Sequence, residues 1–375
     1  MRLQHKLLNW FHKNQRPLPW REHYRPYEVW VSEIMLQQTQ VETALPYFNR
    51  WMKILPTIES LARCGEKKVL KLWEGLGYYS RARNLHKTAK LIMEKHGGEF
   101  PNDYDAILSL KGIGRYTAGA IASIAFNQGK PIVDGNVLRV LSRVYMIKTP
   151  EQFSASLPRS AGLNLRYARG SARIRTNIWD LEESLIPKGQ ARFFNQALME
   201  LGALVCTKDN PRCGICPIRR FCVAFKNNKV ANYPAPKKRK KIVKVTASAL
   251  VISKDGKFLI HRRPEGQIMG GLWEFPEWKL ARNQKISLAE IKEKTTKLVK
   301  NKLGVETIGL KHLGTIKRNY THHLETLYVF LAGTIDRHKS KVRTAESWLS
   351  SWVGRKDFRR YPFSSAHAKI AKLLA

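Results

Sequence analysis

The chain has 375 residues and a formal net charge of +38, because 67 Lys and Arg outnumber 29 Asp and Glu. This length predicts about two domains. No apolar run approaches the ~20 residues that cross a bilayer, so we expect no membrane span. The amphipathic start at residues 1–14 lacks the apolar stretch and cleavage site of a signal peptide, and a weak transit peptide is the less favoured alternative.

The positive charge is spread over both halves of the chain. Residues 1–225 hold 34 Lys and Arg against 18 Asp and Glu, and residues 226–375 hold 33 against 11. Such an excess is typical of nucleic-acid-binding proteins and predicts salt-dependent binding to phosphates. A general basic bias of the solvated surface is the alternative.

Residues 1–225 are predicted to be mostly helical. After the amphipathic start, apolar residues recur at helical spacing in Tyr27–Gln38, Val69–Gly75, Ala82–Lys95, Thr117–Phe126, Asn136–Tyr145 and Phe193–Val205. The segment Thr149–Thr176 breaks this pattern and indicates a basic loop or insertion. Two interpretations of that segment stay open, a disordered loop and an added set of phosphate contacts.

A Pro- and Lys-rich linker at residues 226–245 leads to a second domain at residues 246–375. A solvated connector is favoured there over a nuclear localisation signal. Beyond the linker, apolar and polar residues alternate with the period of two that is typical of strands. Asp255-Gly256 joins two of these strands in a predicted hairpin. The expected elements of this α+β domain are strands at Val245–Ser253, Lys257–Arg263, Thr307–Ile316 and Thr326–Thr334, and helices at Leu288–Leu303 and Ser365–Leu374.

Four of the five cysteines, Cys206, Cys213, Cys216 and Cys222, form the pattern C-x6-C-x2-C-x5-C. This clustering argues against disulfides and for a reduced, intracellular compartment, with Cys64 as a partly buried structural thiol. Zinc sites usually place two ligand pairs across a longer loop, whereas iron–sulfur clusters use closely spaced cysteines. We therefore favour a [4Fe–4S] cluster over zinc. Basic residues in the same loop suggest a phosphate-facing surface.

The segment Leu110–Ala118 has the form of a DNA-binding helix–hairpin–helix. Gly112 and Gly114 permit a tight hairpin whose backbone N–H groups can approach a phosphate closely. Val133-Asp-Gly-Asn136 follows, and it places Asp134 at the start of an apolar helix. On spacing alone, Asp134 is interpreted as an N-cap.

Together, the hairpin, Asp134 and the cysteine loop resemble the helix–hairpin–helix DNA glycosylases that carry an iron–sulfur cluster. Within them, four segments look like the adenine DNA glycosylases (MutY): Pro17–Arg21, Trp30–Val41, Trp73–Tyr79 and Leu201–Cys206. The resemblance covers nearly all of residues 7–225 and continues more weakly to the C-terminus. It implies a mostly α glycosylase domain followed by an α+β Nudix-like domain.

The resemblance implies a monofunctional hydrolase that excises adenine mispaired with 8-oxoguanine or guanine in base excision repair. Tyr116 occupies the position at which the bifunctional endonuclease III-type enzymes carry a lysine nucleophile, so no Schiff base is expected. The alternatives are a bifunctional glycosylase/lyase, a thymine mismatch glycosylase and a non-catalytic mismatch binder. The implied partner is double-stranded DNA, bound by a monomer. The implied location is the bacterial cytoplasm and nucleoid, or the nucleus or an organelle of a eukaryote.

Glu33 is the candidate general acid. It lies among apolar neighbours, which raise the pKa of a carboxyl group towards neutrality. By resemblance, Glu33 protonates adenine and Asp134 stabilises the oxocarbenium-like sugar. Tyr116 is expected to shape this site, and Asn136 to orient the acid and water.

The remaining candidates are expected to contact the substrate. By resemblance, Leu18, Trp20 and Arg21 form the wall of the base pocket, and Gln196 reads the adenine edge. Gln38 and Tyr78 match the intercalating residues, with Thr39 beside the opposite base. Tyr320, Thr321 and His322 match the loop that senses 8-oxoguanine. Ordinary packing or turn roles are the alternatives for these residues.

Nudix hydrolase activity is not expected. Glu290 and Glu293 lie amid lysines and lack the Glu-rich pattern that binds Mg²⁺.

Overall fold

The computed structural model describes residues 2–147, 177–235, 241–267, 269–320, 322–334 and 349–374. The predicted basic segment Thr149–Thr176 and the residue Thr321 lie outside these ranges. The chain separates into two compact units, Met1–Arg63 with Asn84–Lys238 and Cys64–Arg83 with Arg239–Ala375. No helix in the described residues is both long enough and apolar enough to cross a membrane.

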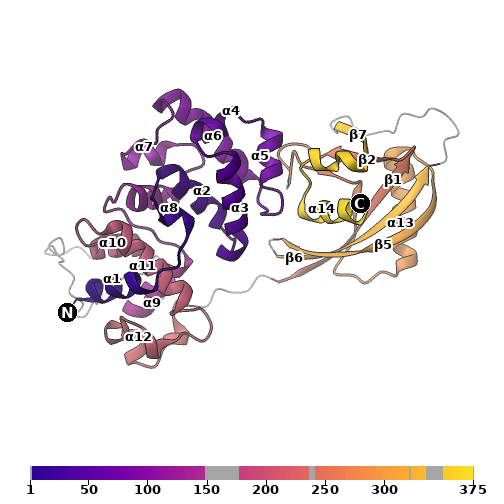
Figure 1. Cartoon of the computed structure of the whole chain (residues 1–375). Helices are drawn as coiled ribbons and strands as arrows, with labels where there is room; N and C mark the ends of the chain where they lie inside the picture. The colour runs from indigo at the N-terminus through magenta and orange to yellow at the C-terminus, as the bar shows by residue number, and fades with distance from the viewer. Residues whose placement is uncertain are drawn as a thin grey trace. The chain divides into compact units, whose positions relative to one another are not determined.

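The first unit is built from helices and short turns (Figure 1). Its helices are α1 (Leu3–Asn14), α2 (Pro26–Leu36), α3 (Val41–Ile54), α4 (Ile58–Arg63), most of α6 (Ser80–His96), α7 (Tyr104–Ser109), α8 (Arg115–Ala120), α9 (Gly135–Tyr145), α10 (Ile178–Leu185), α11 (Ala191–Leu204) and α12 (Val223–Lys226). The 3-10 turns are Pro19–Arg21, Cys213–Ile215, Arg219–Phe221 and Val230–Asn232.

Most helices with a clear apolar period match their predicted segments, but the predicted helix Val69–Gly75 is displaced, because the observed helix is Glu66–Leu72 and Trp73–Gly75 form a turn. The predicted helix Thr117–Phe126 differs, because α8 ends at Ala120 and a π-helical turn, Ile121–Ala125, completes the segment. A period read over ten residues does not separate these two helix types. Helix α3 was not predicted, and it carries Pro46 in its interior.

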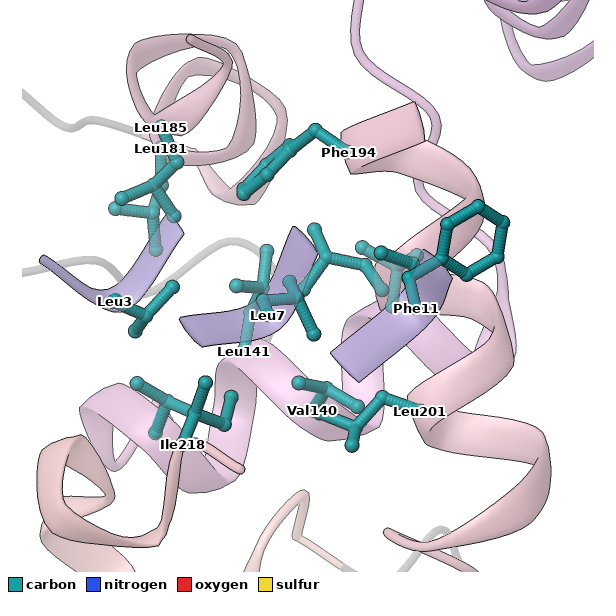
Figure 2. Close-up of a cluster of buried hydrophobic side chains, with 14 of the residues drawn as sticks. Leu3, Leu7, Phe11, Val140, Leu141, Leu181, Leu185, Phe194, Leu201 and Ile218 are labelled. Atoms are coloured by element: carbon teal, nitrogen blue, oxygen red, sulfur yellow. The ribbon is translucent and has the colours of Figure 1, made fainter. Parts of the chain in front are cut away.

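The core of this unit joins the start of the chain to the region of the cysteines. Figure 2 shows Leu3, Leu7 and Phe11 of α1 lying among apolar side chains of α9, α10 and α11. Ile218, from the cysteine loop, packs into the same cluster. The loop is therefore anchored to the helical core.

The second unit contains a mixed sheet (Figure 1). The strands are β1 (Val243–Lys254), β2 (Lys257–Arg262), β3 (Trp273–Glu274), β4 (Glu277–Arg282), β5 (Thr307–Tyr320), β6 (His323–Thr334) and β7 (Leu349–Gly354). Their order is β3-β2-β1-β6-β5, with β4 pairing with β1 and β7 with β2. The predicted hairpin at Asp255-Gly256 is present, because Lys254 pairs with Lys257 and both turn residues have positive φ.

Two helices cover the two faces of this sheet. Helix α14 (Ser365–Leu373) packs on one face with Ala249 and Val251 of β1, and α13 (Leu288–Leu303) packs on the other with Leu250 and Ile252. Because alternate residues of a strand point to opposite faces, β1 is buried continuously instead of in alternation. A 3-10 turn, Arg355–Arg360, precedes α14.

The segment Cys64–Arg83 belongs to this second unit, although residues 84–238 separate it in the sequence from the rest of that unit. It contains α5 (Glu66–Leu72), the turn Trp73–Tyr79 and the start of α6. The Tyr79 hydroxyl donates to the Phe363 carbonyl at 2.9 Å, and Lys71 Nζ donates to the Tyr361 carbonyl at 3.1 Å.

Candidate active site

The carboxyl group of Glu33 is enclosed within the helical unit. Glu33 lies on α2 among buried apolar side chains, and only 4% of its surface is exposed. Burial raises the pKa of this carboxyl to about 7, which is the direction that its apolar neighbours predicted. The charge of Asp134 acts in the same direction, whereas the hydrogen bond from Tyr116 and the charge of Arg21 act against it. A carboxyl with this pKa is present in both protonation states near neutral pH.

Tyr116 connects α8 to this acid. Its hydroxyl donates a hydrogen bond to Glu33 Oε2. Burial raises the pKa of the phenol well above its usual value, and the neighbouring carboxylates raise it further, so the phenol remains a donor. The basic neighbours Lys111 and Arg115 are exposed, and the Arg115 guanidinium lies over the Trp179 ring, 4.4 Å from its centroid.

Asp134 is an N-cap and also part of the site. Its Oδ1 accepts from the Val137 N–H at 2.7 Å at the start of α9, and its Oδ2 accepts from Asn136 Nδ2 at 2.9 Å. Burial raises the pKa of this carboxyl, while these hydrogen bonds oppose the shift. The cap and the site are compatible because capping uses one carboxylate oxygen and leaves the second beside Asn136.

A cavity of about 550 Å³ brings the predicted residues together. Nine predicted site residues line it: Leu18, Trp20, Arg21, Glu33, Thr39, Tyr116, Asp134, Asn136 and Gln196. The Gln196 amide is held at both ends, since its Oε1 accepts from Arg21 Nε at 2.9 Å and its Nε2 donates to the Arg192 carbonyl at 3.0 Å. The cavity is therefore bordered by a fixed amide and by the carboxyl groups of buried Glu33 and half-buried Asp134.

Glu200 and Arg16 also line this cavity, and the sequence reasoning missed both. Glu200 is 1% exposed and accepts hydrogen bonds from Arg16 Nε at 2.8 Å and Arg21 Nη2 at 2.9 Å. Burial alone would raise the pKa of Glu200, but these arginines lower it to about 2. Glu200 follows Gln196 by four residues on α11, so helical spacing could have indicated that the two share a face.

The other predicted DNA contacts lie outside this cavity. Gln38 is exposed just after α2, with a left-handed φ of 59°. Tyr78 lies in the second unit, is 53% exposed and has a φ of 46°. Tyr320 is the last residue of β5 and pairs with His323 of β6, and exposed His322 directly precedes β6.

The two hairpin glycines differ in what they require. Gly112 has a φ of 84°, and an added Cβ would lie 2.9 Å from the Asn84 Cβ, so a side chain is excluded there. Gly114 is the N-cap of α8 with an extended backbone at φ −94°, and an added Cβ would meet open space. The backbone conformation therefore requires glycine at Gly112 but not at Gly114, and the close approach of the hairpin N–H groups to a phosphate stays a prediction.

The four clustered cysteines border one small cavity of about 20 Å³, which α9 and α11 close. Among the described residues, no three His, Cys, Asp or Glu side chains converge closely enough to hold a single metal ion. Burial and then the other three sulfurs raise the pKa of Cys216 to about 12. Four thiolates at this place require a compensating cationic centre, so this donor set fits an iron–sulfur core.

Two arginines of α9 connect the cysteine loop to the rest of the unit. Arg143 donates to Cys206 Sγ at 3.3 Å and to the Tyr233 carbonyl at 3.0 Å. Arg139 donates to the Cys206 carbonyl and to Asn136 Oδ1, both at 2.7 Å. Because Asn136 in turn donates to Asp134, a continuous chain of hydrogen bonds runs from the cysteine loop to that carboxylate.

Comparison with known proteins agrees with this geometry. Residues 31–159 match the model of the HhH-GPD superfamily base excision DNA repair proteins, and residues 247–373 match the NUDIX domain. The fold and site thus define a helix–hairpin–helix base excision repair protein with a C-terminal Nudix domain. The adenine DNA glycosylase of Buchnera aphidicola subsp. Baizongia pistaciae is 39% identical over 296 residues, 78% of each chain. The human adenine DNA glycosylase is 31% identical over 98% of this chain and 73% of its own length. The chain belongs to the adenine DNA glycosylase family.

A thermostable thymine-DNA glycosylase is a structural neighbour, with a TM-score of 0.49 and 26% identity over 60% of this chain and 95% of that one.

Proposed function

We propose that this protein is a monofunctional glycosylase that hydrolyses the N-glycosidic bond of adenine mispaired with 8-oxoguanine or guanine in double-stranded DNA. The observation that carries the proposal is the meeting of Glu33, Tyr116 and Asp134 at one cavity, with the pKa of Glu33 raised to about 7. The cavity volume of about 550 Å³ leaves room for an extruded base.

Glu33 is the proposed general acid. Adenine is a poor leaving group, so a proton delivered to its ring by Glu33 lowers the barrier to departure. The Tyr116 hydroxyl holds one oxygen of this carboxyl and orients it. After departure, the deprotonated Glu33 can accept a proton from the attacking water.

Asp134 is the proposed electrostatic partner of the sugar. Bond cleavage develops positive charge on the sugar, and a carboxylate fixed beside it stabilises that charge without having to reorganise. The Val137 N–H and the Asn136 amide hold Asp134 in place. Gln196, fixed by Arg21, is the proposed reader of the adenine edge, with Leu18 and Trp20 as the adjoining wall.

Gln38 and Tyr78 are proposed to fill the space that the extruded base leaves, with Thr39 beside the opposite base. The exposure of Gln38 and Tyr78 supports this role, and so does their left-handed backbone, because non-glycine residues held in that conformation cluster at functional sites. Tyr320, Thr321 and His322 are the proposed sensor of 8-oxoguanine. The proposed domain limits are 1–225 for the glycosylase, 226–245 for the linker and 246–375 for the Nudix-like domain.

We assign Cys206, Cys213, Cys216 and Cys222 to one [4Fe–4S] cluster. A bound cluster would supply four iron–thiolate bonds that cross-link the loop. The groups proposed to react with DNA all lie on other elements, so the assigned role is structural. We further propose that the protein acts as a monomer in the compartment that holds the DNA of the cell.

The test is a single-turnover assay on duplexes with one A:8-oxoguanine pair. We expect adenine release from the wild type, strand cleavage only after alkali, and a loss of at least about a thousandfold in Glu33→Gln. Strand nicking coupled to base release would favour the bifunctional alternative. A Glu33→Gln variant as active as the wild type would favour a different acid.

A further inference from the structure

A second cavity, of about 450 Å³, lies in the unit that contains the sheet. The turn after α5 forms one wall through Tyr78 and Tyr79, and the start of α14 forms another through Ser364 and Ser365. Arg83 also lines it. This cavity shares no residue with the one around Glu33 and has no role in the proposed chemistry.

The N-terminus of α14 is left uncapped at this cavity. Ser364 is the N-cap residue, but its side chain makes no capping hydrogen bond. Its hydroxyl is buried, with the residue only 2% exposed, and has no hydrogen-bond partner among the described residues. The first N–H groups of a helix have no partner within the helix, and together with the helix dipole they favour an anion.

The charged side chains that line the cavity are both cations. Arg83 and Arg318 line it, and no acidic residue is among the lining residues that the structure describes. Arg318 pairs with Glu277 at 2.6 Å and also with Glu325, and Arg83 pairs with Glu66 at 3.2 Å and donates to the Gly270 carbonyl. Both guanidinium groups are therefore fixed in place before any ligand arrives.

The two walls are joined by hydrogen bonds. The Tyr79 hydroxyl accepts from the Gly75 N–H at 3.2 Å and donates to the Phe363 carbonyl, which directly precedes Ser364. The indole of Trp73 donates to the Gly77 carbonyl at 3.0 Å, which fixes the turn that carries Tyr78. The turn that carries the exposed Tyr78 is therefore joined to the residue that precedes the N-cap of α14.

We propose that the N-terminus of α14 binds a phosphate group, with the Ser364 hydroxyl as a further donor and Arg83 as the nearby cation. The expected source is a phosphodiester of duplex DNA beside the point at which Tyr78 enters the helix. A free nucleotide or inorganic phosphate offers the same chemistry. The choice of DNA rests on the proposed function, whereas the site itself rests on the geometry of this cavity.

The test places a carboxylate at the site by Ser365→Glu. An acidic residue in the first turn of a helix favours folding, so the variant should be folded while it repels phosphate. Ser365→Gln matches its size without the charge. Leu288→Glu is the matched control, because it adds the same charge at the first position of α13, where Leu288 is exposed.

We expect Ser365→Glu to weaken binding to undamaged duplex DNA about tenfold, while Ser365→Gln and Leu288→Glu stay within about twofold of the wild type. A scan of duplexes with single methylphosphonates should find one position that weakens the wild type and leaves Ser365→Glu unaffected. Equal losses in Ser365→Glu and Leu288→Glu, or in Ser365→Glu and Ser365→Gln, would overturn the site.

Thermal unfolding with millimolar inorganic phosphate or deoxyadenosine monophosphate separates the two sources. One outcome is that these ligands stabilise the wild type but not Ser365→Glu, while no methylphosphonate position weakens DNA binding. This outcome would assign the site to free phosphate and overturn the DNA source. Adenine release by the wild type is measured separately. Absence of release with the binding difference intact would refute the proposed function and leave this site standing.

Discussion

Glu33 and Glu200 line the same cavity yet have opposite pKa shifts. Burial dominates at Glu33 and raises its pKa to about 7, whereas two arginines hold the pKa of Glu200 at about 2. The neighbours of Glu33 in the sequence are apolar, so its environment could be predicted. Glu200 could not be recognised in this way, because its partners Arg16 and Arg21 are 184 and 179 residues away.

The stability of the protein should depend on pH through Glu33. The pKa of Glu33 is raised from 4.5 to about 7 in the folded protein. Its favourable contribution to the free energy of unfolding is therefore complete below pH 4.5 and is lost as the pH rises through 7. Glu33→Gln removes this loss, so we expect a gain of about 1–3 kcal/mol over the wild type at pH 8 and little difference at pH 4.5. Urea unfolding of both proteins at pH 8 and pH 4.5 measures this difference in the free energy of unfolding. A difference of equal size at the two pH values would refute the prediction.

Excision should follow the same titration, and its rate should decline in the same direction as the stability. If protonated Glu33 is the acid, the single-turnover rate should fall about tenfold for each unit of pH above 7. A rate that rises through this range would identify Glu33 as a base before bond cleavage.

Glu200→Gln should show how much the ion pairs of Glu200 with Arg16 and Arg21 contribute to stability. The substitution keeps the shape but removes the charge that holds both arginines, so we expect a loss of about 2–4 kcal/mol at pH 7. Since the pKa of Glu200 is lowered, its contribution to the free energy of unfolding is present at pH values above the usual carboxyl pKa and is lost as the pH falls towards 2. The difference between variant and wild type should therefore shrink on acidification. A constant difference in denaturant titrations from pH 7 to pH 3 would contradict this.

At the scale of elements, the site depends on close contacts between helices. Helices with an uninterrupted apolar period were predicted well, whereas α3, with its internal proline, and the two-residue strand β3 were not. A proline inside a helical pattern predicts that the helix ends there, which hides α3, whereas β3 has too few residues for an apolar period to be measured. Their positions are determined by packing, which the sequence does not display locally.

The contact between α11 and α9 should be intolerant of a single methyl group. An added Cβ at Gly202 would lie 2.5 Å from the Asn136 Cβ and 3.0 Å from its Cα. Gly202→Ala should therefore displace the start of α9 with Asn136 and Asp134, with a loss of about 1–3 kcal/mol in stability and about tenfold to a hundredfold in excision rate. Gly129→Ala is the control, because an added Cβ there meets nothing within 4 Å. Equal behaviour of the two variants would show that α9 can adjust without loss.

At the scale of the whole molecule, a Nudix fold is present whose catalytic helix has other uses. On α13, Glu290 closes a capping box with Ser287, and Glu293 pairs with Lys297 at 2.6 Å. We therefore expect no Mg²⁺-dependent hydrolysis of nucleoside triphosphates, measured as release of pyrophosphate or monophosphate. Hydrolysis that disappears in Glu290→Gln would show that α13 is a working catalytic helix.

The division of the molecule was only partly readable from the sequence. The change of period near residue 245 indicated two folds, and the structure contains both. The membership of Cys64–Arg83 in the second unit left no local signal, because it depends on contacts such as that between Tyr79 and Phe363, which lie 284 residues apart.

Because Tyr79 and Phe363 lie far apart in the sequence, they are also synthesised at different times. At a synthesis rate of roughly 5–20 residues per second, Phe363 leaves the ribosome about 15–60 s after Tyr79. For that interval the apolar side of the segment Cys64–Arg83 has no C-terminal partner. A part of the chain that is made late therefore completes one that is made early, and a chain that ended before Phe363 would lack the acceptor for the Tyr79 hydroxyl.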